Sequence, residues 1–338
     1  MFSRLAVVLL ALALLPPSRC VAAPAPGLSS VDRVRIAEAF RIADALGDRV
    51  WSGWRKAPFA VLLVTPEHEF LIRHPKPTTD FTEIGRDPVL KTQVWVRPRT
   101  YPTNFLATFP AVNGVSTIVI GQAENTQAND SARWVITLLH EHFHQLQDSQ
   151  PGFFADVEAL GLSRGDKTGM WMLNYPFPYA RPDVVEAHAV MSRALCNALR
   201  SRQQPDFGSR VAIYLEAENR FRALLPPDDH RYFEFQLWKE GIARYTEFRL
   251  ARLASTDYKP SREFQRLKDY RSFAAVEDEI IGHIVTELDT VTLDKAERTV
   301  VYSFGAAAGL VLDRATPGWQ RQYFKRKFSL DAYFPAER

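Results

Sequence analysis

Cysteine is almost absent from the chain, which has only Cys20 and Cys196 among 338 residues. Cys20 falls in an apolar leader, so a mature chain keeps Cys196 alone and no internal disulfide is predicted. Cys196 lies among apolar residues and is interpreted as a buried, unreactive side chain. Glycine loops that bind phosphate and the Gly-x-Ser-x-Gly motif are also absent. The sequence therefore offers no nucleophilic serine or cysteine of the usual kinds.

An excess of one charge is also lacking. The 42 lysines and arginines nearly balance 39 acidic residues, which gives a formal net charge of +3. Because no long basic run occurs, neither nucleic acid nor an anionic membrane is predicted as a partner. A short basic cluster at residues 321–327 is interpreted as a solvated helix face. Hydrophobic residues make up 46% of the chain, enough for a sizeable core in one large or two modest domains.

Long apolar runs are missing except at the N-terminus. Arg4 precedes an apolar run at residues 5–15, and prolines and small residues follow up to Ala25. This order is typical of a secretory signal peptide, here residues 1–23. The run is short for a transmembrane helix. The sequence thus predicts a secreted or periplasmic protein with a cleaved signal and no stable membrane insertion.

The most informative stretch is residues 140–144, His-Glu-His-Phe-His, which fits the pattern His-Glu-x-x-His. Capping residues at 129–131 and an apolar run without Gly or Pro predict a buried helix here. On that helix His140 and His144 share one face, one turn apart, where both can bind a single Zn²⁺. Glu141 is then placed as the general base for a water molecule.

Burying two histidines and a glutamate is costly unless something compensates them, and a metal ion would do so. The alternative is a chance match on a solvated helix face, which the apolar flanks disfavour. His142 lies about 200° around the helix from His140, so it is interpreted as a supporting or packing histidine.

A catalytic zinc site needs a third protein ligand and an open fourth position. Residues 240–245 read Glu-Gly-Ile-Ala-Arg-Tyr inside a second predicted helix, so Glu240 is the candidate third ligand. Gly241 costs about 1 kcal/mol in a helix interior relative to alanine. That cost is justified where another backbone or the metal-binding helix comes close. Glu247, on a similar helix face, is the competing ligand.

The sequence predicts an α+β fold. Residues 24–150 are expected to form a small antiparallel sheet with the His140 helix, and residues 151–338 a mainly helical part that supplies the third ligand. The expected strands cover about 59–64, 69–72, 94–96 and 115–120, with a loop at 109–114 and an irregular stretch at 164–182. The other expected helices cover about 31–50, 184–202, 209–225, 230–254, 274–288 and 293–314, with a last one after Pro317.

The two motifs together resemble the gluzincin group of zinc metallopeptidases, and residues 303–319 resemble a late helix of uncharacterised bacterial members. The resemblance implies a zincin-like fold in which residues 115–120 form an edge strand over the site. It also implies His140, His144 and Glu240 as ligands of Zn²⁺. The chain departs from thermolysin-like enzymes in its long gap between the motifs. It also has Arg244 where those enzymes have an aspartate that orients a histidine.

The implied chemistry is hydrolysis in which Zn²⁺ polarises a carbonyl and Glu141 moves the proton. A donor to the oxyanion is also needed. Tyr245, Tyr302 and His188 are the candidates, and each can also be interpreted as a buried packing residue. Glu186 and His188 are not a second metal site, because i,i+2 spacing puts them on different helix faces.

The leading hypothesis is a secreted zinc hydrolase that cleaves a peptide or small amide. A non-catalytic zinc-binding protein is the main alternative, although a structural site has no need of Glu141. A zinc hydrolase of a non-peptide amide or ester is the other. The sequence does not specify the substrate, the mode of cleavage or the oligomeric state.

Overall fold

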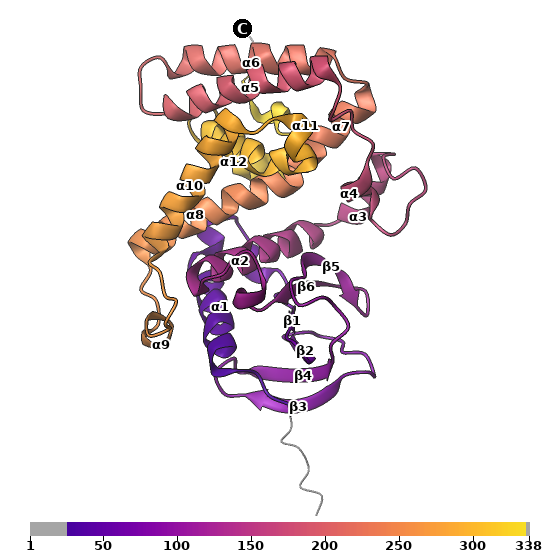
Figure 1. Ribbon diagram of the computed structural model, residues 1–338, viewed down its shortest axis with the longest axis vertical. Helices are drawn as coiled ribbons and strands as arrows, with labels where there is room; N and C mark the ends of the chain where they lie inside the picture. The colour runs from indigo at the N-terminus through magenta and orange to yellow at the C-terminus, as the bar shows by residue number, and fades with distance from the viewer. Residues whose placement is uncertain (1–25, 336–338) are drawn as a thin grey trace, which may run out of the picture.

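The structure is a computed structural model that describes residues 26–335. The expected signal peptide, with Cys20, lies outside the described residues. The fold is α+β, with a sheet and its helices in the first half of the chain and helices after it (Figure 1). Cys196 is a free, buried cysteine, as expected.

The first helix, α1 (Ser30–Val50), begins where Ser29 accepts a hydrogen bond from the Asp32 backbone amide. Six strands follow in one sheet with the order β3-β4-β2-β1-β6-β5. Their bounds are β1 Val61–Val64, β2 His68–Ile72, β3 Thr82–Asp87, β4 Thr92–Pro98, β5 Leu106–Val112 and β6 Val115–Gly121.

The prediction of an antiparallel sheet is wrong for one pair. β1 runs parallel to β6, with Val61 beside Ile118, while the other neighbours are antiparallel. Every residue of β1 is buried, and such an apolar run looks the same in sequence for either direction. The chain between residues 65 and 114 supplies the long connection that a parallel pair needs.

The expected edge strand is also misplaced. β6 lies inside the sheet, and β5 forms the edge next to it. The predicted loop at residues 109–114 is wrong in part, because β5 extends to Val112 and includes Pro110. A proline is tolerated on an edge strand, where its missing N–H faces away from the ladder. The other missed strand, β3, is mostly exposed and carries no apolar alternation.

The helix α2 (Ser131–Asp148) carries the His-Glu-x-x-His motif. The Asp130 side chain caps it by accepting from the Arg133 backbone amide. Nearly all of its residues are buried, because it packs on β6, α1 and α8. This burial confirms the prediction of a buried helix.

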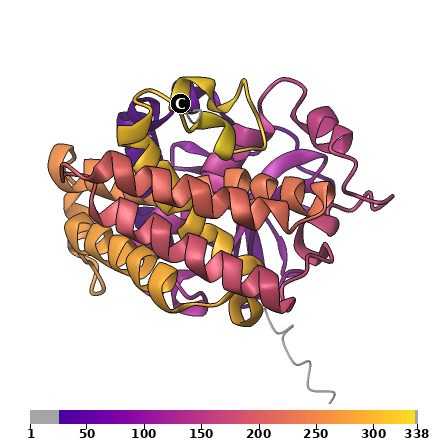
Figure 2. The ribbon, with the colours of Figure 1, turned by 90° about the horizontal axis from the view of Figure 1, so that it is seen from above.

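The rest of the chain is mainly helical, as predicted, and α5, α6, α8, α10 and α12 form the upper layers of Figure 1. Seen from above, α5 and α6 lie side by side across the other helices (Figure 2). The predicted helix at 230–254 is interrupted by a single π-helical turn, Leu237–Gly241. The helices are α3 Phe153–Ala159, α4 Trp171–Asn174, α5 Pro182–Arg200, α6 Phe207–Ala223, α7 Pro227–Gln236, α8 Ile242–Asp257, α9 Arg262–Gln265, α10 Phe273–Thr290, α11 Leu293–Ala296, α12 Val300–Ala315 and α13 Gln320–Tyr323.

One hydrophobic core joins the sheet part to the helical part. Trp51, after α1, lies at its centre and contacts rings of α2, α8 and the C-terminal segment, among them Phe143, Tyr245 and Trp319. A smaller apolar cluster around Leu62 and Val119 covers the other face of the sheet. Among residues 26–335, none of the helices has both the length and the apolar character that a membrane crossing requires.

Candidate metal centre

The structure brings His140, His144 and Glu240 together. One ligand atom from each residue lies within 4.8 Å of the other two. The Glu240 Oε2 atom is 3.3 Å from His144 Nε2 and 3.9 Å from His140 Nε2. Ligands about 2.1 Å from a tetrahedral Zn²⁺ are about 3.4 Å apart. The three side chains therefore have the spacing that a zinc ion requires.

Each histidine is oriented by a hydrogen bond on its other ring nitrogen. Nδ1 of His140 is 2.7 Å from the Glu247 carboxylate, and Nδ1 of His144 is 2.7 Å from the Gln147 side-chain oxygen. Gln147 donates its amide to the Trp238 and Lys239 carbonyls, so its oxygen faces His144. Because both partners accept, each Nδ1 donates and each Nε2 presents a lone pair towards Glu240.

Glu247 was the competing candidate for the third metal ligand, and the structure gives it a different role. Its carboxylate does not join the ligand group but orients His140. Arg133 and Arg244 donate to its other oxygen at 2.7 and 3.0 Å. These two arginines and His140 outweigh burial and hold the pKa of Glu247 below its usual value. Glu247 therefore orients His140, and Arg244 supports Glu247.

Glu240 projects from the π-helical turn Leu237–Gly241, at the junction of α7 and α8. Such turns occur mostly at functional positions. Burial by itself raises the pKa of Glu240, but His144, Lys239 and His140 lower it well below its usual value. Burial lowers the pKa of His144, and Lys239 adds to this, yet Glu240 and Glu141 outweigh both and raise it. The Glu240 carboxylate is thus stabilised as an anion by the histidines and Lys239 around it.

Gly241 allows the close approach that the sequence analysis inferred, and the approaching backbone is that of α12. A methyl group built on Gly305 of α12 would lie 2.6 Å from the Gly241 Cα atom and 2.9 Å from the Leu237 carbonyl oxygen. Neither contact can be relieved by a side-chain rotation. The candidate ligand Glu240 is therefore positioned by two segments in direct backbone contact.

Replacing Gly305 by alanine is expected to lower the free energy of unfolding by about 1–3 kcal/mol, because the two backbones must separate. Urea unfolding followed by circular dichroism measures this change. Gly282→Ala on exposed α10 is the control, since nothing lies within 4 Å of its added methyl group. We expect that control to gain up to about 1 kcal/mol from helix propensity. Equal stability of Gly305→Ala and the wild type would contradict the close contact.

Glu141 lies next to the ligand histidines and is buried. Thr108, on the edge strand β5, donates to the Glu141 carboxylate at 2.7 Å and also contacts its carbonyl at 3.1 Å. The Thr108 hydroxyl donates to the Oε2 atom of Glu141, so the Oε1 atom stays available to accept another hydrogen bond. The sequence analysis missed Thr108 because β5 itself was not predicted.

The structure places the two tyrosines that were candidate oxyanion donors at different distances from the three-residue cluster. The Tyr302 ring stacks on the His140 ring, with centroids 6.2 Å apart. Its hydroxyl accepts from Arg298 at 3.5 Å. The structure does not bring Tyr245 to the cluster, because its hydroxyl is bound by Asp313 and Arg249 on the far side of α8. Tyr302 therefore remains the candidate beside the ligands.

His142 packs away from the ligands, as its helical angle indicates. Its ring stacks on Phe59 with centroids 3.7 Å apart, and Nδ1 contacts the Gln145 oxygen at 3.0 Å. Burial lowers the pKa of His142 to about 3. It is a neutral packing histidine between α2 and the sheet.

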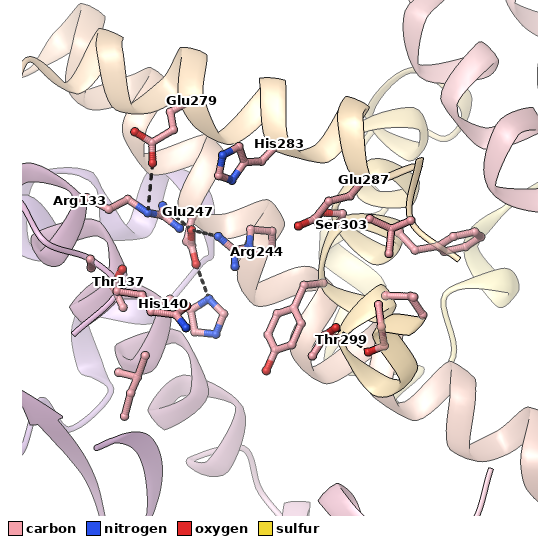
Figure 3. A pocket seen from close by; sticks show the side chains of 18 of the residues that line it. Arg133, Thr137, His140, Arg244, Glu247, Glu279, His283, Glu287, Thr299 and Ser303 are labelled. Atoms are coloured by element: carbon pink, nitrogen blue, oxygen red, sulfur yellow. Dashed lines mark hydrogen bonds and ion pairs between the residues drawn. The ribbon is translucent and has the colours of Figure 1, made fainter. Parts of the chain in front are cut away.

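A cleft of about 920 Å³ opens beside the cluster, between the sheet and the helices α5, α10 and α12. His140, Glu141 and Tyr302 line it together with Leu106 of β5. In Figure 3, Glu279, His283 and Glu287 project from α10 on the side of the cleft that faces His140. The volume suits a substrate of small-molecule or short-peptide size.

His188 lines the same cleft but is 2% exposed, and neither of its ring nitrogens has a hydrogen-bond partner in the structure. Rings of Phe221, Phe233 and Phe304 surround it. Burial lowers the pKa of His188 to about 4. Its imidazole is therefore neutral at pH 7.

This pKa predicts an acid-labile contribution to stability. The unfolded chain binds a proton at about pH 6.5 and the folded chain only at about pH 4. The contribution is complete above pH 6.5 and is lost as the pH falls towards 4. We expect metal-free wild type to lose up to about 3 kcal/mol more over this range than His188→Leu. Urea unfolding at several pH values measures the difference, and identical slopes for the two proteins would contradict it.

The residues present fit a zinc ion, by their spacing, their oriented lone pairs and the negative Glu240.

Searches with protein-family models, among curated proteins and among solved structures each found no match to the chain. The local geometry therefore carries the functional argument.

Proposed function

We propose that the chain is a secreted zinc-dependent hydrolase, and specifically a peptidase of the gluzincin type. The observation that carries this proposal is the convergence of His140, His144 and Glu240 from separate helices. Their ligand atoms lie within 4.8 Å of one another, and His140 also lines the cleft together with Glu141. Two histidines and a glutamate with an open fourth position form a catalytic set of zinc ligands.

The chain's own residues support hydrolysis rather than a structural role. A bound Zn²⁺ supplies Lewis-acid polarisation of a carbonyl and lowers the pKa of a water molecule to about 7. Glu141 lies one residue from a ligand, with Oε2 held by Thr108 and with its side chain at the cleft. It can accept the water proton and return it to the leaving amine. A non-catalytic zinc site has no use for this carboxylate.

Tyr302 is proposed as the donor to the oxyanion. Burial and Glu240 raise the pKa of its phenol above the usual value although Arg298 opposes them, so the hydroxyl keeps its proton. Its oxygen accepts from Arg298, which leaves the proton free to point into the cleft. A donor that is already in place costs no reorganisation during the reaction.

The edge strand β5 favours a peptide over another amide or ester. β5 is the last strand of the sheet. It pairs with β6 along one side, and its other side is the edge of the sheet. Leu106 of β5 lines the cleft and Thr108 binds Glu141. An extended peptide can add to such an edge through main-chain hydrogen bonds, which would carry its scissile bond past Glu141.

Metal removal tests the proposal. The mature protein is stripped with a chelator and then reconstituted with Zn²⁺, and each form is incubated with a mixed peptide library read by mass spectrometry. We expect cleavage by the zinc form, a fall of at least about 10²-fold after stripping and recovery on zinc addition. Cleavage that survives stripping would contradict the metal role. Hydrolysis of simple amides or esters, with all peptides intact, would contradict the peptidase assignment.

A further inference from the structure

A second group of ionisable side chains lies far along the chain from the first. Glu218 comes from α6, His230 from the first turns of α7, and Asp331 from the segment after α13. One ligand atom of each lies within 4.8 Å of the other two. All three line a separate cavity of about 660 Å³.

This cavity brings three acidic side chains close to one histidine, His230. Glu218, Glu234 and Asp331 are three carboxylates, and the first two are buried. Arg222 reaches Asp331 only at 3.6 Å with a largely exposed side chain. Arg231, which also lines the cavity, is bound by Asp228 at 2.5 Å. Buried carboxylates need a nearby cation.

Glu218 is the member of the group that has a buried oxygen without a hydrogen bond. It is 8% exposed, and its buried Oε1 atom makes no hydrogen bond in the structure. That atom faces Nε2 of His230 at 3.5 Å. A buried carboxylate oxygen without a donor costs about 1–3 kcal/mol or more. His230 is therefore the nearest partner of this oxygen, and a cation between the two side chains would satisfy both.

We propose that Glu218, His230 and Asp331 form a second metal site, which binds a divalent transition-metal cation. Ligands about 2.1 Å from a tetrahedral cation are about 3.4 Å apart. The separation of His230 Nε2 and Glu218 Oε1, 3.5 Å, matches this spacing, and the Asp331 carboxylate lies within 4.8 Å of both. One imidazole with two carboxylates favours Zn²⁺ or Mn²⁺, since Ca²⁺ takes oxygen ligands alone.

The site joins the end of the chain to α6 and α7. Glu234 already accepts hydrogen bonds from the backbone amides of Leu330 and Asp331, at 2.6 and 3.0 Å. A cation on Asp331 would add a second tie between the C-terminal segment and the helices. Its role is thus stabilisation of the fold, separate from the cleft.

Metal titration of the full mature chain tests the site without any assay of activity. Isothermal titration with ZnCl₂ and then MnCl₂ is run on Glu240→Ala, in which the first cluster has lost a ligand. We expect one remaining equivalent, weakened tenfold or more by adding either His230→Ala or Glu218→Gln. His283→Ala on α10 is the matched control, because His283 lies outside the group, and it should bind as its parent does.

Thermal unfolding gives a second readout. The metal is expected to raise the melting temperature of Glu240→Ala, and this rise should disappear with Glu218→Gln, which keeps the size of the side chain. Unchanged binding in both site variants would overturn the proposal. Equal binding of Ca²⁺ with and without His230 would also overturn it, because the imidazole would then not be a ligand.

Discussion

Replacing Glu141 by glutamine is expected to lower peptide hydrolysis by about 10²–10⁴-fold, the range that a positioned general base contributes. The amide keeps the size of the side chain and can still contact the Thr108 hydroxyl. It can no longer take a proton from water. The loss should appear in kcat, because the group acts on the reacting atoms. Progress curves on one cleaved peptide, wild type beside variant, measure it.

The control for this variant is its metal content. Glu141 is not among the residues that could hold the metal ion, so Glu141→Gln should keep the zinc of the wild type. Thr108→Val tests the hydrogen bond from β5 and should reduce the rate by a smaller factor. Full activity of Glu141→Gln, with zinc retained, would show that another group moves the proton.

Much of the metal centre could be predicted from the sequence, because its parts are local. His140 and His144 are spaced by one helical turn, and Glu240 stands in a recognisable motif. The orienting residues were harder to find. Gln147 lies three residues after His144 on a buried helix, where a polar side chain needs a partner, so a signal was present. Thr108 had no such signal, because its strand is an edge whose pattern a proline interrupts.

The helices were predicted better than the sheet for a related reason. An amphipathic or buried helix shows its period over many residues, as α2, α5 and α10 do. Strand direction is set by contacts between distant segments, so nothing within β1 specifies its parallel pairing with β6. The π-helical turn was also not predicted. It lies where Gly241 meets Gly305 of α12, a contact between distant segments that the local residue pattern does not specify.

Substitutions of Glu240, in the π-helical turn, and of Glu247, on α8, distinguish the proposed metal ligand from the residue that orients His140. Glu240→Ala removes one of three ligands, and we expect purified protein to lose its zinc at the cluster. Glu247→Gln keeps the ligand set but weakens the acceptor for the His140 Nδ1 proton. Changes of this kind cost about 10–100-fold in metal affinity. Metal content by mass spectrometry and zinc competition against a chromogenic chelator measure both.

Which of the two variants loses more zinc affinity shows which glutamate is the ligand and which one supports it. If Glu247 were the ligand and Glu240 the support, Glu247→Gln would abolish binding and Glu240→Ala would only weaken it. The structure predicts the reverse, because Glu247 lies 2.7 Å from His140 Nδ1 while Glu240 faces the Nε2 atoms of both histidines. Glu247→Gln also leaves Arg133 and Arg244 without their carboxylate, so part of its effect should appear as lower stability of the metal-free chain. Comparing both variants in metal-free and zinc-loaded form separates that loss from the change in affinity.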